Sequence, residues 1–461
     1  MTLIKSISGI RGTIGGKPND GLTPLDIVKF TCAFARFIQN QSGKKNIKVV
    51  IGRDARISGE MVRNLVVGSL QGMGADVIDL GLSTTPTVEV AVPEENADAG
   101  IILTASHNPR QWNALKLLNG KGEFISADEG AEVLRIADQG DIDFADVDDL
   151  GSYTMDASYL EKHIKMVLDL PLVDPEAIRS ANFTVAVDAV NSTGGMFVPA
   201  LLKALGVKEV IELYCDPNGQ FPHNPEPLPE NLTEIASVIR DRGADVGIVV
   251  DPDVDRLAMV CEDGSMFGEE YTLVAVSDFV VSNTPGNTVS NLSSTRALRD
   301  VTTAHGQQHY AAAVGEVNVV EKMKEVSAII GGEGNGGVIY PELHYGRDAL
   351  VGIGLFLTQL AKSGMSCSQL RDSFPKYIIS KNKIELTPDI DVDVVLRGME
   401  AKYASEQVNT IDGVKIDFAN EWVHLRKSNT EPIIRIYAES SSKEQADQLA
   451  AQIIKDIKEL I

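Results

Sequence analysis

Short apolar runs that end abruptly in polar residues and glycine recur four times along the chain. Each run holds β-branched or other apolar residues in succession, without a polar residue at every second position. Such runs are typical of strands that are buried on both faces, as in parallel sheets covered by helices. The pattern therefore predicts an α/β architecture. The runs are IKVVIGRD (47–54), TVAVDAVN (184–191), DVGIVVDPDVDR (245–256) and SAIIGGEGNG (327–336).

Amphipathic segments follow the first two runs. Residues 58–74 carry apolar side chains at helical spacing, with Ser58 placed to cap the helix, and residues 74–81 then resemble another strand. After the second run, residues 197–206 and 208–214 repeat this order. The order of strand, loop, helix and strand predicts several similar α/β units in series.

The C-terminal part of the chain follows a different pattern. After a basic segment (376–388), three strand-like stretches precede a segment of helical period (442–460). We expect a small antiparallel sheet backed by helices. The strand-like stretches are residues 412–418, 422–428 and 432–440. The apolar face of the helix holds Ala446, Leu449, Ile453, Ile457 and Leu460.

The net charge of the chain limits the kinds of molecule that it can bind. The chain has 461 residues, enough for about three domains, and its formal net charge is −23. Such a charge repels nucleic-acid phosphates and anionic lipids, and the sequence shows no basic patch that would compensate. We therefore expect neither a nucleic-acid nor a membrane partner.

The sequence also predicts the compartment. Its first residues lack the apolar segment and cleavage site of a signal peptide, and no apolar run of about 18 residues occurs. We expect a cytoplasmic protein with reduced thiols, because its cysteines are scattered and form no CxxC pair. They are Cys32, Cys215, Cys261 and Cys367.

A serine follows the apolar run 99–103 in the motif TASHNPRQWNALK (104–116). A polar side chain beyond the carboxyl end of a strand lies where open α/β sheets usually bind ligands. The adjacent Ser106 and His107 do not indicate a hydrolase, because chain neighbours rarely orient as nucleophile and base and no G-x-S-x-G elbow is present. An Asn-Pro turn with capping side chains is the alternative interpretation.

Three carboxylates follow another buried run, in DPDVDR (251–256). An extended chain would spread Asp251, Asp253 and Asp255 over about 13 Å, so they reach one hard cation only if the backbone curls into a loop. The proline at the second position favours such a turn. An EF-hand loop is disfavoured because Arg256 replaces the required glycine. A solvated acidic loop is the alternative interpretation.

Two further clusters carry hydrogen-bonding groups. In GEGNGG (332–337), which HYGRD (344–348) follows, glycine lets the main chain approach a ligand, and Glu333 and Asn335 suit vicinal hydroxyls. RKSNTEPIIR (426–435) concentrates donors in an acidic chain, as a phosphate nest does. A tight turn and a solvated loop are the respective alternatives.

The order and spacing of these four motifs resemble the α-D-phosphohexomutase family over almost the whole chain. TASHNP with a following lysine is similar to the family's active-serine motif, and DPDVDR to its metal loop. GEGNGG is similar to its sugar-recognition loop, RKSNTEP to its phosphate loop, and an early GIRG (9–12) to its N-terminal motif. The matched residues are Arg11, Ser106, His107, Asn108, Lys116, Asp251, Asp253, Asp255, Arg256, Glu333, Asn335, Arg426, Ser428, Thr430 and Glu431.

The resemblance implies a particular fold. Three similar mixed α/β domains and a C-terminal α+β domain like the TATA-binding protein would surround a central cleft. We expect the serine domain at 1–150, the metal-loop domain at 151–256, the sugar-loop domain at 257–372 and the phosphate-loop domain at 373–461.

The resemblance also implies a phosphoserine. Ser106 would carry the phosphoryl group, which adds about −1.5 to −2 charge, and a shared Mg²⁺ would balance this charge and that of the three aspartates. The phosphoserine gives its phosphoryl group to a hexose monophosphate, and the bound hexose 1,6-bisphosphate returns its other phosphate to the serine. The implied metal ligands are Ser106, Asp251, Asp253 and Asp255.

Other residues receive roles through the same resemblance. Protein groups in phosphoryl transfer mainly position the reactants and neutralise charge. Arg11, Lys116 and Arg256 are therefore assigned to the transferring phosphate, with Lys116 as general acid/base and His107 beside the serine. Glu333, Asn335 and Arg347 are assigned to the substrate. The phosphate that does not transfer is assigned to Arg426, Ser428, Asn429, Thr430 and Arg435.

The sequence departs from the family pattern at three positions. Pro252 stands where many relatives have glycine, and Asn335 replaces a common serine. Gly337 stands where several relatives have a histidine thought to assist proton transfer. We therefore consider His344 and Arg347 for that role.

The substrate is expected to be a phosphosugar. The motifs are most similar to phosphoglucosamine mutases of the archaeal-like branch, which favours conversion of glucosamine 6-phosphate to glucosamine 1-phosphate. Phosphoglucomutase or phosphomannomutase activity is the alternative, because one hydrogen bond at C2 distinguishes these sugars by about 1–3 kcal/mol. An aspartyl phosphatase with Asp251 as nucleophile and a non-catalytic phosphosugar-binding protein are remoter alternatives.

Overall fold

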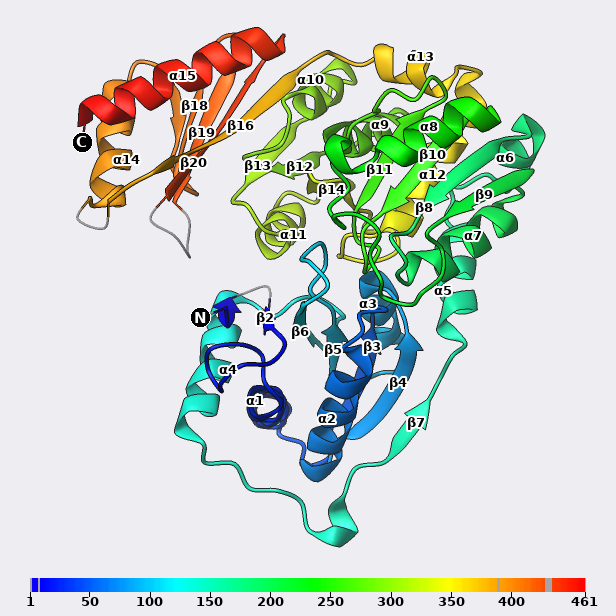
Figure 1. Ribbon diagram of the computed structural model, residues 1–461, viewed down its shortest axis with the longest axis vertical. Coiled ribbons are helices and arrows are strands. Elements are labelled where there is room, and N and C mark those ends of the chain that lie inside the picture. Colours follow the sequence, from blue (N-terminus) through cyan, green and yellow to red (C-terminus); the bar gives the residue numbers. More distant parts are fainter. Residues whose placement is uncertain (1, 7–8, 388–389, 428–432, 461) are drawn as a thin grey trace. The chain divides into compact units, whose positions relative to one another are not determined.

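Four β-sheets organise the computed structural model, which describes residues 2–6, 9–387, 390–427 and 433–460 (Figure 1). The chain divides into two compact units. Unit 1 comprises Met1–Thr272 and Gly336–Leu370, and unit 2 comprises Leu273–Asn335 and Arg371–Ile461. The four sheets with their helices confirm the expected α/β class, whereas the exact domain boundaries stay predictions.

The first sheet lies in unit 1 and has the strand order β1-β2-β6-β5-β3-β4-β7. Its predicted central strand, β3, pairs in parallel with β4 and β5. The antiparallel strands β6 and β2 extend it, which the sequence pattern does not predict. The strands are β1 (Ile4–Ser6), β2 (Gly9–Thr13), β3 (Lys48–Arg53), β4 (Asp76–Leu82), β5 (Ala99–Leu103), β6 (Trp112–Asn119) and β7 (Tyr153–Met155).

Helices cover both faces of this sheet, which explains its continuous apolar strands. Val49 and Ile51 belong to the core under α1, α2 and α4, whereas Val50 belongs to the opposite core under α3. Ser58 immediately precedes α2 as expected, but its hydroxyl accepts the Asn113 amide at 2.9 Å and makes no capping hydrogen bond. The helices are α1 (Pro24–Ser42), α2 (Gly59–Gly72), α3 (Thr85–Glu94) and α4 (Ala127–Gln139).

The second sheet, also in unit 1, has the order β11-β10-β8-β9. Strands β10, β8 and β9 are parallel and β11 is antiparallel, so both predicted apolar runs of this region form neighbouring central strands. The strands are β8 (Thr184–Asp188), β9 (Glu209–Leu213), β10 (Val246–Val250) and β11 (Leu257–Cys261). The remaining elements of this region include η1 (Val147–Asp149), α5 (Tyr159–Leu168), α6 (Pro175–Ala181), α7 (Gly194–Leu205), η2 (Pro229–Asn231), α8 (Thr233–Arg242), β15 (Gly337–Ile339) and α12 (Ala349–Ser363).

Unit 2 contains a parallel arrangement in which β12 lies between β13 and β14. The fourth predicted apolar run forms β14 and ends at Glu333. The strands are β12 (Thr288–Asn291), β13 (His309–Ala312) and β14 (Ile330–Glu333). The helices of this part of the sequence are α9 (Glu269–Asn283), α10 (Ala297–Ala304) and α11 (Glu316–Glu325), and α13 (Cys367–Asp372) follows later in the chain.

The C-terminal sheet of unit 2 is antiparallel, in the order β16-β20-β19-β18-β17, and α15 packs on β16 and β20. This confirms the expected sheet backed by helices. Ile453 and Ile457 are fully buried, but Leu460, expected on the same face, is 43% exposed at the end of the helix. The elements are β16 (Ile378–Glu385), α14 (Val392–Lys402), β17 (Gln407–Asn409), β18 (Val414–Asp417), β19 (Trp422–Lys427), β20 (Ile433–Ser440) and α15 (Lys443–Leu460).

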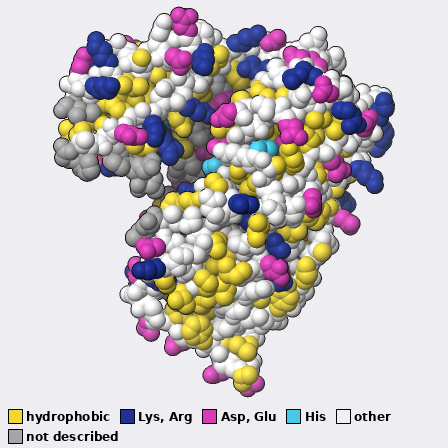
Figure 2. All heavy atoms as spheres, in the orientation of Figure 1, with side chains coloured by type: hydrophobic (Ala, Val, Ile, Leu, Met, Phe, Trp, Pro, Cys, Tyr) yellow, Lys and Arg dark blue, Asp and Glu magenta, His cyan; other side chains and the backbone are white. Residues whose placement is uncertain are grey.

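The surface carries charged side chains of both signs, as the composition of the chain predicts (Figure 2). On the face drawn in Figure 2, basic side chains are interspersed with acidic ones. Among the described helices, none has both the length and the apolar character that crossing a membrane requires.

The C-terminal core provides a test of this packing. Ile453→Ala should lower the free energy of unfolding of this region by about 2–5 kcal/mol, because it leaves a cavity in a fully buried position. The matched change Leu460→Ala on the same helix should cost about 0.5 kcal/mol or less. Urea unfolding reports both through Trp422 fluorescence in a Trp112→Phe background, since the chain has only 2 tryptophans. Equal midpoints for the two variants would contradict the assigned core.

Candidate functional site

Ser106 lies on the loop that follows β5, in an unusual backbone conformation. Its φ is 49°, in the left-handed region, which costs a residue with a Cβ roughly 1–2 kcal/mol. The side chain is 8% exposed, and Oγ donates to Asp251 Oδ2 at 2.7 Å. His107 Nδ1 lies 3.4 Å from the same Oγ. The structure therefore brings the predicted serine of the first sheet to the predicted acidic loop of the second.

The acidic loop after β10 is curled, as convergence of its side chains requires. Asp251, Asp253 and Asp255 are buried, and each offers an oxygen within 4.8 Å of the others. Asp251 Oδ1 accepts the amides of Asp255 and Arg256, both at 3.2 Å. Val254 at the turn has a φ of 63°, a rare conformation for a β-branched residue. The side chain of Asp251 thus closes the loop that carries the other two acids.

Lys116 and Arg347 form close ion pairs with two of the three acids, Asp253 and Asp255. Lys116 on β6 places Nζ 2.7 Å from Asp253 Oδ2 and 3.4 Å from Asp255 Oδ2. Arg347 Nη2 lies 2.6 Å from Asp255 Oδ2. All five side chains are at most 9% exposed, so these ion pairs are shielded from water.

Burial and mutual repulsion shift the pKa values of this cluster. Burial raises the pKa of Asp251 well above its ordinary value, and the carboxylates of Asp253 and Asp255 add to the rise. Burial alone would also raise the pKa of Asp253, but Lys116 reverses this shift and lowers it. Burial alone would lower the pKa of Lys116, but Asp253 and Asp255 raise it. Lys116 therefore stays protonated at neutral pH.

The three acids fit a hard divalent cation. Within the described ranges, Asp253 Oδ1 and Asp255 Oδ1 are buried and have no hydrogen-bond donor. Buried carboxylate oxygens without donors are costly unless a cation lies against them. Carboxylate oxygens are also the ligands that Mg²⁺ prefers. The loop therefore could hold a metal ion, with Asp251, Asp253 and Asp255 as its protein ligands.

Three arginines of unit 1 that are assigned to the phosphate or the substrate influence the pKa of His107. Burial lowers the pKa of His107 well below its ordinary value, and the charges of Arg256, Arg11 and Arg347 act in the same direction. The imidazole is therefore neutral at neutral pH. Arg11 on β2 faces Ala114 of β6 in the antiparallel ladder, which places GIRG beside the strand that carries the predicted lysine.

His344, considered above for proton transfer, belongs to a second buried group. Its Nε2 lies 3.1 Å from Asp348 Oδ2, and its Nδ1 lies 3.4 Å from Glu89 Oε2. His163 Nε2 contacts the same Asp348 oxygen at 2.9 Å. Of the two residues considered, Arg347 is therefore the one that contacts the acidic loop.

Unit 2 carries the predicted sugar-binding residues. Glu333 is 5% exposed, and its Oε1 accepts the Asn291 side-chain amide at 2.8 Å and the Gly315 main-chain amide at 3.1 Å. Asn335 Nδ2 lies 3.4 Å from Glu333 Oε2. These contacts fix the direction of the Glu333 carboxylate at the end of β14.

The predicted phosphate residues of unit 2 lie partly within the described chain. Arg426 and Arg435 are direct partners across the antiparallel β19–β20 ladder, and Arg426 Nε lies 2.9 Å from Asp412 Oδ2. Asp412 Oδ2 also accepts the amide of Val314 at 3.0 Å, next to the glycine that contacts Glu333. Ser428, Asn429 and Thr430 lie outside the described residues.

Sequence reasoning missed several residues that hold these groups. Thr85, the first residue of α3, donates its hydroxyl to Asp253 Oδ2 at 2.6 Å, and its amide donates to Asp253 O at 2.9 Å. The Thr-Pro start of this helix is visible in the sequence, but 168 residues separate it from the acid that it contacts. Asn291 and Asp412 were missed for the same reason, since only the fold brings them to Glu333 and Arg426.

The chain matches four domain models of known proteins, which together cover most of its length. Domain models described as "Phosphoglucomutase/phosphomannomutase", alpha/beta/alpha domains I, II and III and C-terminal domain, match residues 3–142, 158–264, 268–377 and 387–456. The chain is 34% identical over 454 residues to a phosphoglucomutase/phosphomannomutase of Thermococcus kodakarensis, with 98% of each chain covered.

Two further matches span nearly the full length. A phosphoglucosamine/phosphogalactosamine mutase of Sulfurisphaera tokodaii is 31% identical over 458 residues, with 97% of each chain covered. The crystal structure of a phosphoglucomutase/phosphomannomutase family protein of Burkholderia thailandensis superposes with a TM-score of 0.85 at 25% identity, covering 100% of this chain and 98% of the other.

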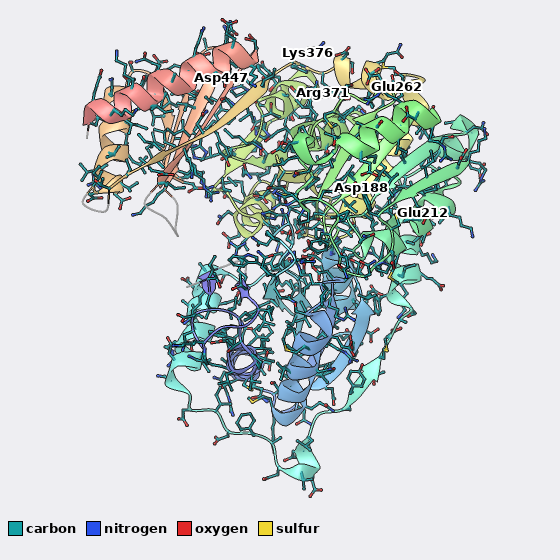
Figure 3. All side chains as sticks on the ribbon, viewed as in Figure 1. Asp188, Glu212, Glu262, Arg371, Lys376 and Asp447 are labelled. Atoms are coloured by element: carbon teal, nitrogen blue, oxygen red, sulfur yellow. The ribbon has the colours of Figure 1, made fainter. Side chains whose placement is uncertain are left out.

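Cation binding tests the acidic loop. Asp253→Asn should weaken Mn²⁺ binding, measured by titration calorimetry, by about tenfold or more, because it removes one charged ligand. Asp188→Asn is the matched control. Asp188 is a buried aspartate at the end of the neighbouring strand β8, paired with His223 and labelled in Figure 3. Equal Mn²⁺ affinities for the wild-type protein and Asp253→Asn would contradict a metal site at this loop.

Proposed function

The chain belongs to the α-D-phosphohexomutase family of intramolecular phosphotransferases, and from that premise we propose that it interconverts glucosamine 6-phosphate and glucosamine 1-phosphate through a phosphoserine at position 106. One observation carries the proposal. The Ser106 hydroxyl lies 2.7 Å from the first of three buried aspartates that fit a divalent cation. A phosphoryl group on this oxygen would meet that cation directly.

The proposed reaction has two halves that use the same serine. In the first, the bond between Ser106 Oγ and phosphorus breaks while a free sugar hydroxyl forms a new bond to phosphorus, giving a bound hexose 1,6-bisphosphate. After the intermediate turns over, the other phosphate returns to Ser106. A bound Mg²⁺ supplies charge neutralisation at the transferring oxygens. Arg11, Arg256 and Arg347 add positive charge around the same group.

Two side chains suit the proton transfers. Lys116 is held protonated by its ion pairs with Asp253 and Asp255, so we assign it as the acid that protonates Ser106 Oγ when the phosphoryl group leaves. His107 is neutral beside the same oxygen, which leaves its imidazole free to accept the proton of the attacking hydroxyl. The reverse half uses both groups in the opposite direction.

Unit 2 supplies the proposed sugar and phosphate contacts. Glu333 and Asn335 would bind sugar hydroxyls, because their carboxylate and amide groups offer acceptors and donors that suit vicinal hydroxyls. Hydrogen bonds from Asn291 and Gly315 already fix the direction of the Glu333 carboxylate. The phosphate that is not transferred would be bound by Arg426 and Arg435, together with Ser428, Asn429 and Thr430, which lie outside the described residues. Ion pairs with phosphate favour arginine because its donors are arranged as a fork.

The proposed sugar rests on motif similarity. GEGNGG with GRD and SNTEP most resembles phosphoglucosamine mutases, and a relative in Sulfurisphaera tokodaii carries a phosphoglucosamine/phosphogalactosamine mutase name. A relative of similar identity carries a phosphoglucomutase/phosphomannomutase name, so glucose and mannose phosphates are the alternative substrates.

Phosphoserine formation is the first test. Intact mass of the purified enzyme should show one added phosphoryl group, mapped to Ser106, and Ser106→Ala should lose both this mass and about 1,000-fold or more of the activity. Ser83→Ala is the matched control, because Ser83 is also buried and directly follows a strand of the same sheet. A hydroxylamine-sensitive phosphate on Asp251 would indicate an aspartyl phosphatase instead. An unmodified protein without turnover would indicate a phosphosugar-binding protein.

Substrate preference is the second test. The value of kcat/KM for glucosamine 1-phosphate should exceed those for glucose and mannose 1-phosphates by about fivefold to 150-fold, which corresponds to one unsatisfied polar contact at C2. Assays with all three sugars at one fixed level of the matching 1,6-bisphosphate provide the comparison. A higher kcat/KM for glucose or mannose 1-phosphate would overturn the proposed sugar and leave the mutase chemistry in place.

A further inference from the structure

A fully buried arginine binds the main chain of the loop that carries Ser106. Arg56 follows β3 and is 1% exposed. Its Nη1 donates to Pro109 O at 2.8 Å and Trp112 O at 3.1 Å, and its Nη2 donates to Asn108 O at 2.7 Å and to Ser106 O. One guanidinium therefore contacts four carbonyl oxygens between the serine and the start of β6.

Asp54 completes this arrangement from the other side. Its Oδ2 accepts Arg56 Nε at 2.9 Å and the hydroxyl of Thr104 at 2.6 Å. Thr104 Oγ1 in turn accepts the amide of Ser106 at 2.9 Å. Asp54 and Thr104 are both fully buried. The serine is thus held at its carbonyl by Arg56 and at its amide through Asp54 and Thr104.

All donors of Arg56 are used in this way. A guanidinium has five N–H donors, and here one serves Asp54 while the other four serve the loop carbonyls. The Asp54 carboxylate also balances its charge at 2.9 Å. No donor of Arg56 is left for a phosphate, so its contribution is to position the loop rather than to bind substrate.

We propose that Asp54 and Arg56 form a positioning clamp that holds Ser106 in its left-handed conformation and thereby sets the direction of the serine oxygen during phosphoryl transfer. The proposal rests on the function proposed above, because it concerns the geometry of the phosphoserine. A left-handed serine persists only where its surroundings over-determine it. Transfer between two oxygens also requires in-line alignment, which a small displacement of the serine loop would remove.

The test separates chemistry from binding. Arg56→Lys keeps the charge but cannot reach four carbonyls from one ammonium group, and Asp54→Asn keeps the shape but removes the charge that anchors the guanidinium. Both variants should lower kcat by about 100-fold while KM changes by about threefold or less, because the sugar and phosphate contacts lie elsewhere. Single-turnover transfer from isotopically labelled phosphoserine enzyme measures the same step directly.

A chemical-rescue experiment adds a readout that loss of stability would not produce. Millimolar guanidinium should restore part of the lost transfer rate in Arg56→Ala, because the ion fits the space of the missing group, and should not accelerate the wild-type enzyme. Arg296→Ala is the matched control. Arg296 is 5% exposed and donates to the carbonyls of three residues outside the serine loop, which are Phe418, Ala419 and Glu421. It should lower thermal stability without slowing single-turnover transfer from Ser106.

The outcomes are distinguishable. If wild-type Ser106 carries phosphate and Arg56→Lys and Asp54→Asn transfer it at wild-type rates, the clamp is overturned and the mutase function stands. If wild-type Ser106 carries no phosphate, the proposed function fails first. If Arg56→Ala does not fold, the lysine and asparagine variants still decide the proposal, with circular dichroism and Mn²⁺ binding to confirm that they are folded.

Discussion

Three carboxylates with oxygens within 4.8 Å of one another, all shielded from water, set the main constraint on unit 1. Two such charges at about 4 Å repel by roughly 4 kcal/mol at an effective dielectric constant near 20. Lys116 from β6 and Arg347 offset this repulsion, and the Thr85 hydroxyl from the start of α3 adds a hydrogen bond. Segments distant in sequence must therefore fold together before the acidic loop is stable.

The two loops that meet at this cluster share a second feature. Ser106 and Val254 both adopt left-handed backbone conformations, one at the serine and one inside the acidic loop. Neither residue favours this conformation by itself. Side chains supply the compensation, since Asp251 closes its own loop and Arg56 contacts the carbonyls of the other. Strain in these loops is thus maintained by buried polar contacts, which makes the position of the serine oxygen well defined.

In unit 2, one short segment contacts both the glutamate proposed to bind sugar hydroxyls and the aspartate that pairs with an arginine proposed to bind phosphate. Val314 donates to Asp412, which pairs with Arg426, and the next residue, Gly315, donates to Glu333. The carboxylate proposed for sugar hydroxyls and an arginine proposed for phosphate are therefore held by adjacent peptide groups. A shift of this segment would move both contacts together.

The sequence by itself determined the fold class, because continuous apolar runs identify strands that are buried on both faces, as β3, β8, β10 and β14 are. It also determined the candidate chemistry, since Ser106, the three aspartates and Lys116 stand in motifs with recognisable spacing. It did not predict the antiparallel strands β6 and β2, and it expected a capping bond at Ser58 that the structure does not have. It also placed Leu460 on the apolar face of the last helix, where the structure leaves this side chain 43% exposed.

Only the tertiary structure decided which residues hold these groups. Thr85, Asn291, Asp412 and Arg56 lack a motif that marks them, and their partners lie far away along the chain. Local pattern depends on interactions between near neighbours, whereas these hydrogen bonds and ion pairs form between segments that meet only when the sheets are assembled.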